Sequence, residues 1–259
     1  MQDAYASPPP RERVRFALES PEMHASDPVQ QYVQQEVDRP TKAWAQEVIN
    51  NTRESEFVKL RTPDFVLLPD QNNSRRNSAP RHRCCHDALP PPRYPSRAIH
   101  RPLTPHHAAR RFNWLSIVTD PAIRSIRDLR AEHLPMLEGM YTQCVQAIQA
   151  EYRVGIEDIM VFANYPPSVY KLHFHFCAPF FQPAAYDAFR MHSLSSIINN
   201  LQLRGGYYAE STFQIPVHSN SELYRAIAAS LRGEPAKAEN SSSTDEYSDD
   251  EPIPFETPE

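Results

Sequence analysis

The spacing of hydrophobic residues predicts helices in two separate parts of the chain. Residues 131–152 carry apolar side chains at intervals of three and four, a spacing typical of an amphipathic helix. A second helix is expected over residues 184–201, and a short closing helix over 221–232. A further helix is expected over residues 41–58, where Thr41 can cap the first turn.

Short runs of β-branched and aromatic residues predict the strands. They cover residues 57–60, 65–68, 113–118, 159–163, 172–178 and 211–215. From residue 112 onward the order is strand, helix, strand, strand, helix, strand. This order predicts an α+β domain with a mostly antiparallel sheet.

Composition limits the core to these parts of the chain. Apolar residues make up 40% of the 259 positions, and there are 26 prolines against 5 glycines. Such a mixture favours a modest core joined to extended or disordered segments. The expected division is a disordered Pro-rich N-terminus (1–39), a helix–strand segment (40–70), an Arg/Pro-rich insertion without fixed structure (71–111), the α+β domain (112–232) and an acidic disordered tail (233–259).

Charge is concentrated in two segments of opposite sign. Residues 75–111 hold nine arginines and one acid, a net charge of +8, whereas residues 234–259 carry −8. The net charge of the whole chain is −5, which excludes a uniformly basic nucleic-acid binder. The basic segment is interpreted as a disordered loop or as an arm that attracts RNA phosphates, and the two readings are compatible.

The sequence shows no signal for secretion or for a membrane span. The N-terminus is polar and then proline-rich, and no apolar run is long enough to cross a bilayer. The four cysteines are too few and too irregularly placed for a disulfide framework. A reducing intracellular compartment is therefore expected.

The segment 170–176 carries the candidate chemistry. On a strand, alternate residues share a face. One face then carries the apolar residues expected in the core: Leu172, Phe174 and Phe176. Lys171, His173 and His175 line the opposite face, where two imidazoles and an ammonium favour a phosphate ligand. A neutral imidazole can also attack phosphorus and form a phosphohistidine.

Two other readings of this segment remain open. The polar residues can be the exposed face of a half-buried strand. They can also contribute two ligands to a zinc site, although no third ligand is evident in the sequence. The cluster Arg81–His86 contains adjacent cysteines without the spacing of common zinc sites, so no metal and no other cofactor is predicted.

The His-x-His pattern after Pro-Pro-Ser-Val-Tyr resembles the histidine-triad motif, and the closest likeness is to scavenger mRNA decapping enzymes. These enzymes hydrolyse the m7GpppN cap of short RNA fragments. Residues 122–135 resemble the segment that opens the family's long helix, and 64–70 resemble a strand that ends beside the cap. The resemblance covers most of 40–232. It implies a histidine-triad-like antiparallel sheet with two helices, preceded by a small cap-binding segment.

The resemblance also assigns roles to individual residues. His173 corresponds to the nucleophile, His175 supports the phosphate, and Lys171 stands in place of the first histidine of the triad. The remaining positions correspond to phosphate-binding residues, Ser168 and Arg190, and to cap-binding residues, Trp44, Glu54 and Asp70. Arg190 is expected on the helix over 184–201. Trp44 is expected to stack on the methylated guanine, whose positive charge an indole face attracts.

The implied function is a hydrolase that releases m7GMP from the cap dinucleotide or from short capped RNA during mRNA decay. The alternatives are a cap-binding relative with weak or no turnover, which Lys171 motivates, and a histidine-triad nucleotide hydrolase of other specificity. The resemblance further implies capped RNA fragments as partners, a homodimer and no membrane. It implies a location in the cytoplasm, with the nucleus as a second site.

Overall fold

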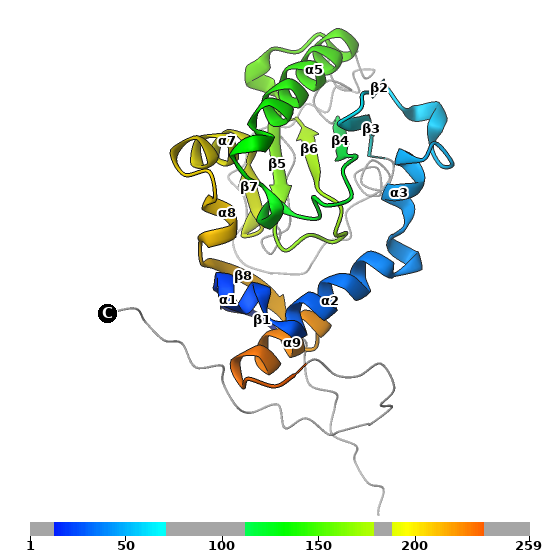
Figure 1. The fold of residues 1–259 in the computed structure, drawn as a ribbon. Helices are drawn as coiled ribbons and strands as arrows, with labels where there is room; N and C mark the ends of the chain where they lie inside the picture. The colour runs from blue at the N-terminus through cyan, green and yellow to red at the C-terminus, as the bar shows by residue number, and fades with distance from the viewer. Residues whose placement is uncertain (1–12, 71–111, 179–187, 236–259) are drawn as a thin grey trace, which may run out of the picture.

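A computed structural model of the 259-residue chain describes residues 13–70, 112–178 and 188–235. Its largest element is a six-stranded sheet in which every neighbouring pair is antiparallel (Figure 1). In spatial order its strands are β2 (Leu60–Arg61), β3 (Phe65–Pro69), β4 (Asn113–Val118), β6 (His173–Cys177), β5 (Met160–Asn164) and β7 (Met191–Ser193). The predicted α+β class and the antiparallel sheet are thus confirmed.

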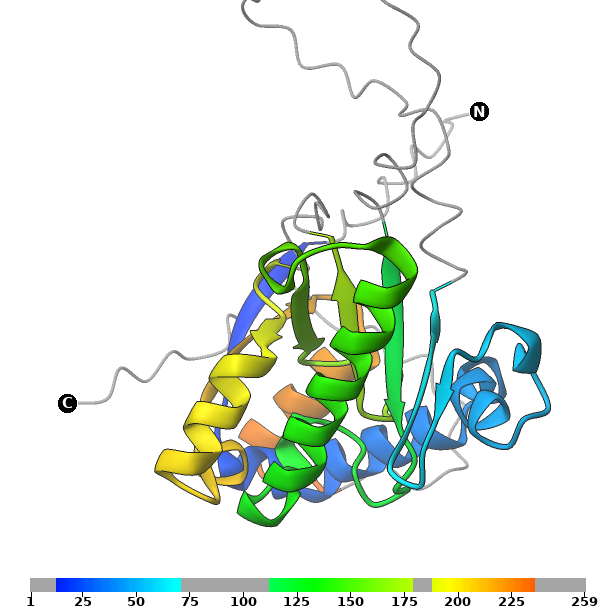
Figure 2. The same ribbon diagram turned by 90° about the horizontal axis from the view of Figure 1, so that it is seen from above.

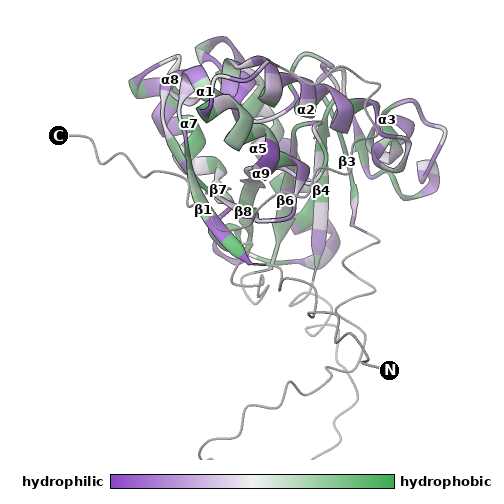
Figure 3. Cartoon of the chain, turned by 90° about the horizontal axis from the view of Figure 1, so that it is seen from below, coloured by the Kyte–Doolittle hydropathy of each residue, from purple (hydrophilic) through white to green (hydrophobic). Residues whose placement is uncertain are grey.

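One face of the sheet is covered by the two long helices of the domain. α5 (Leu134–Tyr152) and α7 (Leu194–Leu203) lie side by side on this face (Figure 2). Leu137, Met140 and Ile148 of α5 pack in the same core as Phe174 and Phe176 of β6. Figure 3 shows hydrophobic colour along much of the central strands, as expected when both faces of a sheet are covered.

The opposite face carries a second, smaller hydrophobic cluster. It contains Val66 and Leu68 of β3 and Leu115 and Ile117 of β4. The short helix α3 (Trp44–Ile49) packs against it, and Val48 is fully buried there. Because alternate residues of a strand point to opposite faces, His173 and His175 lie on this second face, as predicted.

A two-stranded sheet and two helices form a second layer beside the main sheet. β1 (Val14–Glu19) pairs antiparallel with β8 (Phe213–His218), and α2 (Asp27–Asp38) packs against α9 (Glu222–Leu231). The short helix α1 (Pro21–Ala25) joins β1 to α2, and Ser20 caps its first turn. The expectation that residues 1–39 are disordered is wrong for 13–39.

The composition of residues 13–39 did not predict these elements, because the segment has few apolar residues. Some of those few face the core. Val29 and Val33 of α2 share one helix face and are buried in the main core. Ala17 of β1 is buried in the same core. These buried residues, together with the pairing of β1 with β8, hold a segment whose average composition is polar and rich in proline.

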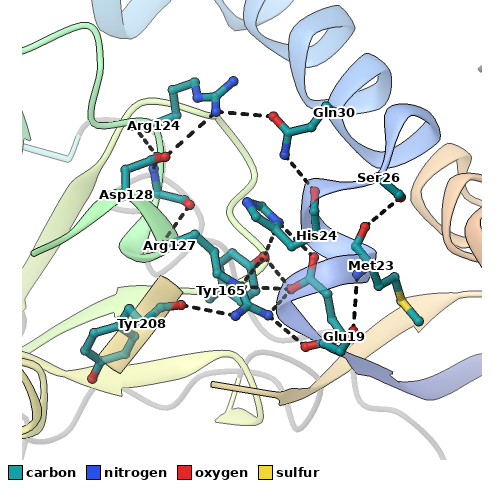
Figure 4. Close-up of polar contacts among 12 residues, drawn as sticks. Glu19, Met23, His24, Ser26, Gln30, Arg124, Arg127, Asp128, Tyr165 and Tyr208 are labelled. Atoms are coloured by element: carbon teal, nitrogen blue, oxygen red, sulfur yellow. Dashed lines mark hydrogen bonds and ion pairs between the residues drawn. The ribbon is translucent and has the colours of Figure 1, made fainter. Parts of the chain in front are cut away.

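A buried ion pair ties this N-terminal segment to the α+β domain (Figure 4). Arg127 donates from Nη2 to Glu19 Oε2 at 2.7 Å and to the Glu19 carbonyl at 2.8 Å. The Tyr165 hydroxyl donates to the same carboxylate at 2.5 Å, and His24 lies 3.2 Å from its other oxygen. Arg127 also donates to the carbonyls of Tyr208 and Ser211, so its guanidinium joins three segments distant in sequence.

Two predicted helices differ from the observed ones. The start of the predicted helix over 184–201 lies outside the described residues, and 191–193 form strand β7. The observed helix α7 begins at Leu194, where Ser193 caps it by accepting from the Ser196 amide. Phe189, within the range of the predicted helix, is 61% exposed. The helix predicted over 41–58 ends at Ile49, because Asn51 and Glu54 adopt left-handed conformations.

Short helical turns complete the described structure. They are η1 (Pro40–Lys42), η2 (Ser55–Phe57), η4 (Ile126–Asp128), η5 (Ala131–His133), η6 (Ile156–Asp158) and α8 (Tyr207–Glu210). The predicted helices over 131–152 and 221–232 are confirmed within a few residues. The Arg/Pro-rich insertion and the acidic tail from residue 236 onward lie outside the described residues.

Candidate active site

Strand β6 places two histidines at the centre of the sheet. It lies between β4 and β5, and His175 pairs with Leu115 on one side and with Phe162 on the other. His173 pairs with Ile117. The two imidazole rings lie 5.4 Å apart between centroids, and both side chains are buried.

Backbone contacts fix the tautomer of His173. Its Nδ1 lies 2.7 Å from the carbonyl oxygen of Lys171. A carbonyl can only accept, so Nδ1 carries the proton and Nε2 of the neutral ring keeps its lone pair. Burial lowers the pKa of His173, with a further lowering from the Arg190 charge, against the opposing effects of the Lys171 carbonyl and Asp70. The strand thus presents a neutral imidazole whose Nε2 carries no proton.

His175 is held as a neutral ring by its surroundings. It stacks on Phe162 with ring centroids 4.9 Å apart. Burial lowers its pKa to about 3, with smaller contributions from His173 and Arg190. Its buried Nδ1 has no hydrogen-bond partner within the described residues. Buried polar atoms usually have a hydrogen-bond partner, so this nitrogen is available to a group that enters the site.

Arg190 lies close enough to the histidines for its positive charge to lower the pKa of both. Its guanidinium donates from Nε and Nη2 to the carbonyl of Pro166, at 2.8 and 2.5 Å. The carbonyl of Arg190 accepts from the Tyr165 amide at 2.7 Å. Arg190 is brought to the site as expected, but it directly precedes β7 instead of lying on a helix.

Ser168 lies in the turn between β5 and β6 and is exposed. Its carbonyl accepts from Lys42 Nζ at 2.5 Å. Lys42 stands two residues before Trp44, and the sequence analysis did not single it out. A lone lysine carries no motif, so only the contact across 126 residues reveals that it belongs to this region.

Asp70 follows β3 and is nearly inaccessible to solvent, with 4% exposure. Its carboxylate accepts from Asn113 Nδ2 at 3.0 Å, and its amide donates to the Asn113 carbonyl at 2.8 Å. Its negative charge raises the pKa of His173. Asp70 therefore lies beside the histidine face of the sheet, as its place in the sequence suggested.

Trp44 begins α3 and packs, partly buried, against the second hydrophobic cluster. That cluster includes Leu115 and Ile117, the cross-strand neighbours of His175 and His173. The indole and the two imidazoles therefore lie over the same face of the sheet. A role in stacking on a base stays a prediction.

Glu54 lies beyond α3 at the start of η2, in a left-handed conformation. Its carboxylate is half-buried and lies 3.5 Å from Arg53 Nε. It belongs to the same α3 segment as Trp44, and its predicted contact with a guanine edge stays a prediction.

Lys171 takes a position that the sequence analysis did not anticipate. Its Nζ donates to the carbonyls of Thr119 and Asp120, at 2.9 and 3.0 Å. Burial lowers the pKa of this amine, and the nearby Asp120 charge acts in the opposite direction. Two N–H groups of the ammonium thus satisfy backbone carbonyls just beyond β4. Its third N–H is the one that the predicted phosphate contact would use.

Across residues 13–70, 112–178 and 188–235, no three His, Cys, Asp or Glu side chains gather as a metal site. In the same part of the chain, no helix is long and apolar enough to cross a membrane.

Comparison with known proteins points to one family. Residues 100–188 match the family model described as "Scavenger mRNA decapping enzyme C-term binding". The human protein named m7GpppX diphosphatase is 34% identical over 105 residues, covering 40% of this chain and 31% of the relative. The Ascaris suum protein of that name is 34% identical over 110 residues, covering 42% and 36%.

A more distant relative extends the match. The Schizosaccharomyces pombe protein named m7GpppX diphosphatase is 23% identical over 168 residues, covering 63% of this chain and 44% of the relative. The chain spans about a third of the length of the mammalian and Ascaris relatives it matches. Together with the histidine pair on β6, these matches identify residues 100–188 as a region similar to the C-terminal part of scavenger mRNA decapping enzymes.

Proposed function

We propose that this protein hydrolyses the triphosphate bridge of an m7GpppN cap, on the cap dinucleotide or on short capped RNA. The observation that carries the proposal is the tautomer of His173. Its Nδ1 proton is committed to the Lys171 carbonyl, so the lone pair of Nε2 is available to attack phosphorus. Similarity to proteins named m7GpppX diphosphatase supports the choice of substrate.

The proposed reaction has two displacements. His173 Nε2 attacks the phosphorus next to m7G, and a phosphorus–nitrogen bond forms as the bond to the bridging oxygen breaks. The nucleoside diphosphate, or the diphosphate end of the RNA, leaves and takes up a proton from solvent. Water then attacks the same phosphorus, loses a proton and releases m7GMP, which regenerates the neutral imidazole.

Side chains around β6 supply the counter-charge in this proposal. Arg190 acts on the site through its charge, and its guanidinium is oriented by the Pro166 carbonyl. A phosphate oxygen would satisfy the buried Nδ1 of His175, which has no partner in the described part of the chain. Ser168 and Lys171 are proposed to contact the other phosphate oxygens.

The methylated base is proposed to bind over α3. N7-methylation makes guanine cationic, and the face of an indole attracts a cation. Trp44 is partly exposed on the same sheet face as His173, which suits this role. Glu54 and Asp70 are proposed to accept hydrogen bonds from the cap.

The proposal includes the setting of the reaction. Consuming capped fragments would give the protein a role in mRNA decay, in the cytoplasm and also in the nucleus. A homodimer is part of the same proposal, because the resemblance implies one.

Incubation with m7GpppG followed by separation of the nucleotides tests this function. The wild-type protein is expected to release m7GMP and GDP, and His173→Ala to release neither. His133→Ala, at a half-buried histidine of η5, is the matched control and keeps turnover. Binding of m7GpppG without any m7GMP would instead support a cap-binding protein without turnover.

A further inference from the structure

A pocket of about 280 Å³ lies on the N-terminal side of the candidate active site. Its walls come from α2, η1, the end of β8 and the start of α9. The turn Pro166–Ser168 and Arg190 form the rest of the lining. None of the candidate active-site residues lies on α2, β8 or α9.

Arg190 belongs both to this pocket and to the histidine site. It lines the pocket, and its positive charge also reaches His173 and His175. Because its guanidinium is held by the Pro166 carbonyl, its position is fixed. A phosphate bound at Arg190 could therefore have a neighbouring phosphate at His173 and the rest of the same molecule in the pocket.

Lys42 places a second fixed cation in the lining. Its Nζ donates to the Ser168 carbonyl at 2.5 Å and lies 3.6 Å from Glu36 Oε2. The Glu36 carboxylate is almost buried and also pairs with Arg39 at 2.7 Å. An oriented ammonium and a guanidinium that line the same pocket favour a ligand that carries phosphate.

The remaining lining suits the uncharged part of such a ligand. Tyr32, Val217 and Leu223 offer apolar surface, and the turn adds Pro167. His218 adds a polar group. Flat apolar surface with a few polar groups is typical of sites for heterocyclic ligands. The volume lies just below the usual range of ligand pockets, which limits the occupant to about one nucleoside.

We propose that this pocket, named here the second-nucleoside pocket, binds the nucleoside and diphosphate that leave when the cap is cleaved. Lys42 and Arg190 hold the phosphates, and the base packs against the apolar wall of α2, β8 and α9. The proposal rests on the proposed function for the order of groups along the substrate. It adds a site that selects for a nucleoside at the end of the triphosphate opposite to m7G.

Calorimetric titration of the full-length chain with GDP tests the pocket directly. Base burial is expected to make GDP bind about tenfold more tightly than pyrophosphate. Leu223→Trp fills the pocket and is expected to lower GDP affinity about tenfold. Leu231→Trp makes the same substitution on the exposed side of α9, outside the pocket, and is expected to leave GDP affinity unchanged.

A second variant keeps the test decisive if Leu223→Trp does not fold. Lys42→Ala removes a partly exposed side chain of η1 and is expected to weaken both GDP and pyrophosphate. Equal affinity for GDP and pyrophosphate, or GDP binding that is lost in Trp44→Ala but kept in Leu223→Trp, overturns the pocket.

Turnover of m7GpppG separates this proposal from the proposed function. If cap is cleaved and Leu223→Trp leaves its KM unchanged, the pocket is wrong and the function stands. If no cap is cleaved but GDP binding depends on Leu223 and Lys42, the function is wrong and a nucleotide pocket is supported.

Discussion

Arg127 and Glu19, 108 residues apart, form an ion pair in which both side chains are almost completely buried, with Nη2 2.7 Å from Oε2. The pair connects β1 to the α+β domain and, through the Tyr165 hydroxyl, to the turn that carries Pro166 and Ser168. The N-terminal segment is thereby part of the framework that supports the candidate active site.

Removing one partner of this pair is expected to destabilise the protein strongly. Arg127→Met leaves the Glu19 carboxylate buried without its cation, and the expected loss is about 3–5 kcal/mol of unfolding free energy. Tyr165→Phe removes one hydrogen bond to the carboxylate and is expected to cost about 1–3 kcal/mol. Urea unfolding measures both. A loss below 1 kcal/mol for Arg127→Met would contradict the role assigned to the pair.

Stability is expected to fall as the pH is lowered from 7 towards 4. Burial lowers the pKa of His175 to about 3 and that of His192 to about 4, so the unfolded chain binds protons that the folded chain does not. The stability that comes from keeping these rings neutral is complete above the ordinary histidine pKa of 6.5. It is lost progressively as the pH falls from there to the folded-state pKa of each ring. For His175 alone the expected loss at pH 5 is about 2 kcal/mol.

Thermal unfolding across this pH range measures the effect. His175→Gln is expected to flatten the dependence of Tm on pH relative to the wild-type protein. An unchanged slope in His175→Gln would show that this ring is not buried and neutral in the folded protein.

Replacement of Trp44 is expected to act on methylated cap alone. Loss of the indole removes the cation–π contact, so Trp44→Ala should weaken m7GpppG binding about tenfold. Affinity for unmethylated GpppG should change little, because that guanine is uncharged. Trp44→Phe should bind m7GpppG with an affinity between those of the wild-type protein and Trp44→Ala. Calorimetry gives all these affinities, and equal losses for both dinucleotides would exclude a methyl-specific stack.

Arg190→Lys is expected to lower kcat/KM for m7GpppG about a hundredfold. Lysine keeps the charge but cannot form the paired contact from Nε and Nη2 to the Pro166 carbonyl that orients the guanidinium. Arg204→Lys, in an exposed pair with Glu210, is the control and keeps wild-type kinetics. Full activity in Arg190→Lys would show that charge alone suffices at this position.

The spacing of apolar residues along the sequence predicted the strand and the helix whose side-chain faces follow from that spacing, β6 and α5. The period of two along 171–176 correctly divided β6 into a core face and a histidine face, because register on a sheet fixes every side chain. The spacing of three and four over 131–152 predicted α5 in the same way. The predicted start of the helix over 184–201 was wrong, because 191–193 form a strand and Ser193 caps a helix that begins at Leu194.

The spacing of residues along the sequence does not predict which distant segments come into contact. Glu19 and Arg127, and Lys42 and Ser168, meet only after the chain has folded, and no local pattern predicts that either pair is in contact. Arg190 was predicted from the resemblance, yet its orientation depends on the Pro166 carbonyl of another turn. The tautomer of His173 depends likewise on a backbone carbonyl that only the folded strand positions.

Rapid quenching followed by mass spectrometry tests most directly whether Nε2 of His173 attacks phosphorus. During turnover of m7GpppG, the peptide that contains His173 is expected to carry an added m7GMP group that is lost in acid. His173→Ala is expected to show neither adduct nor turnover. Sustained release of m7GMP by His173→Ala would contradict the account.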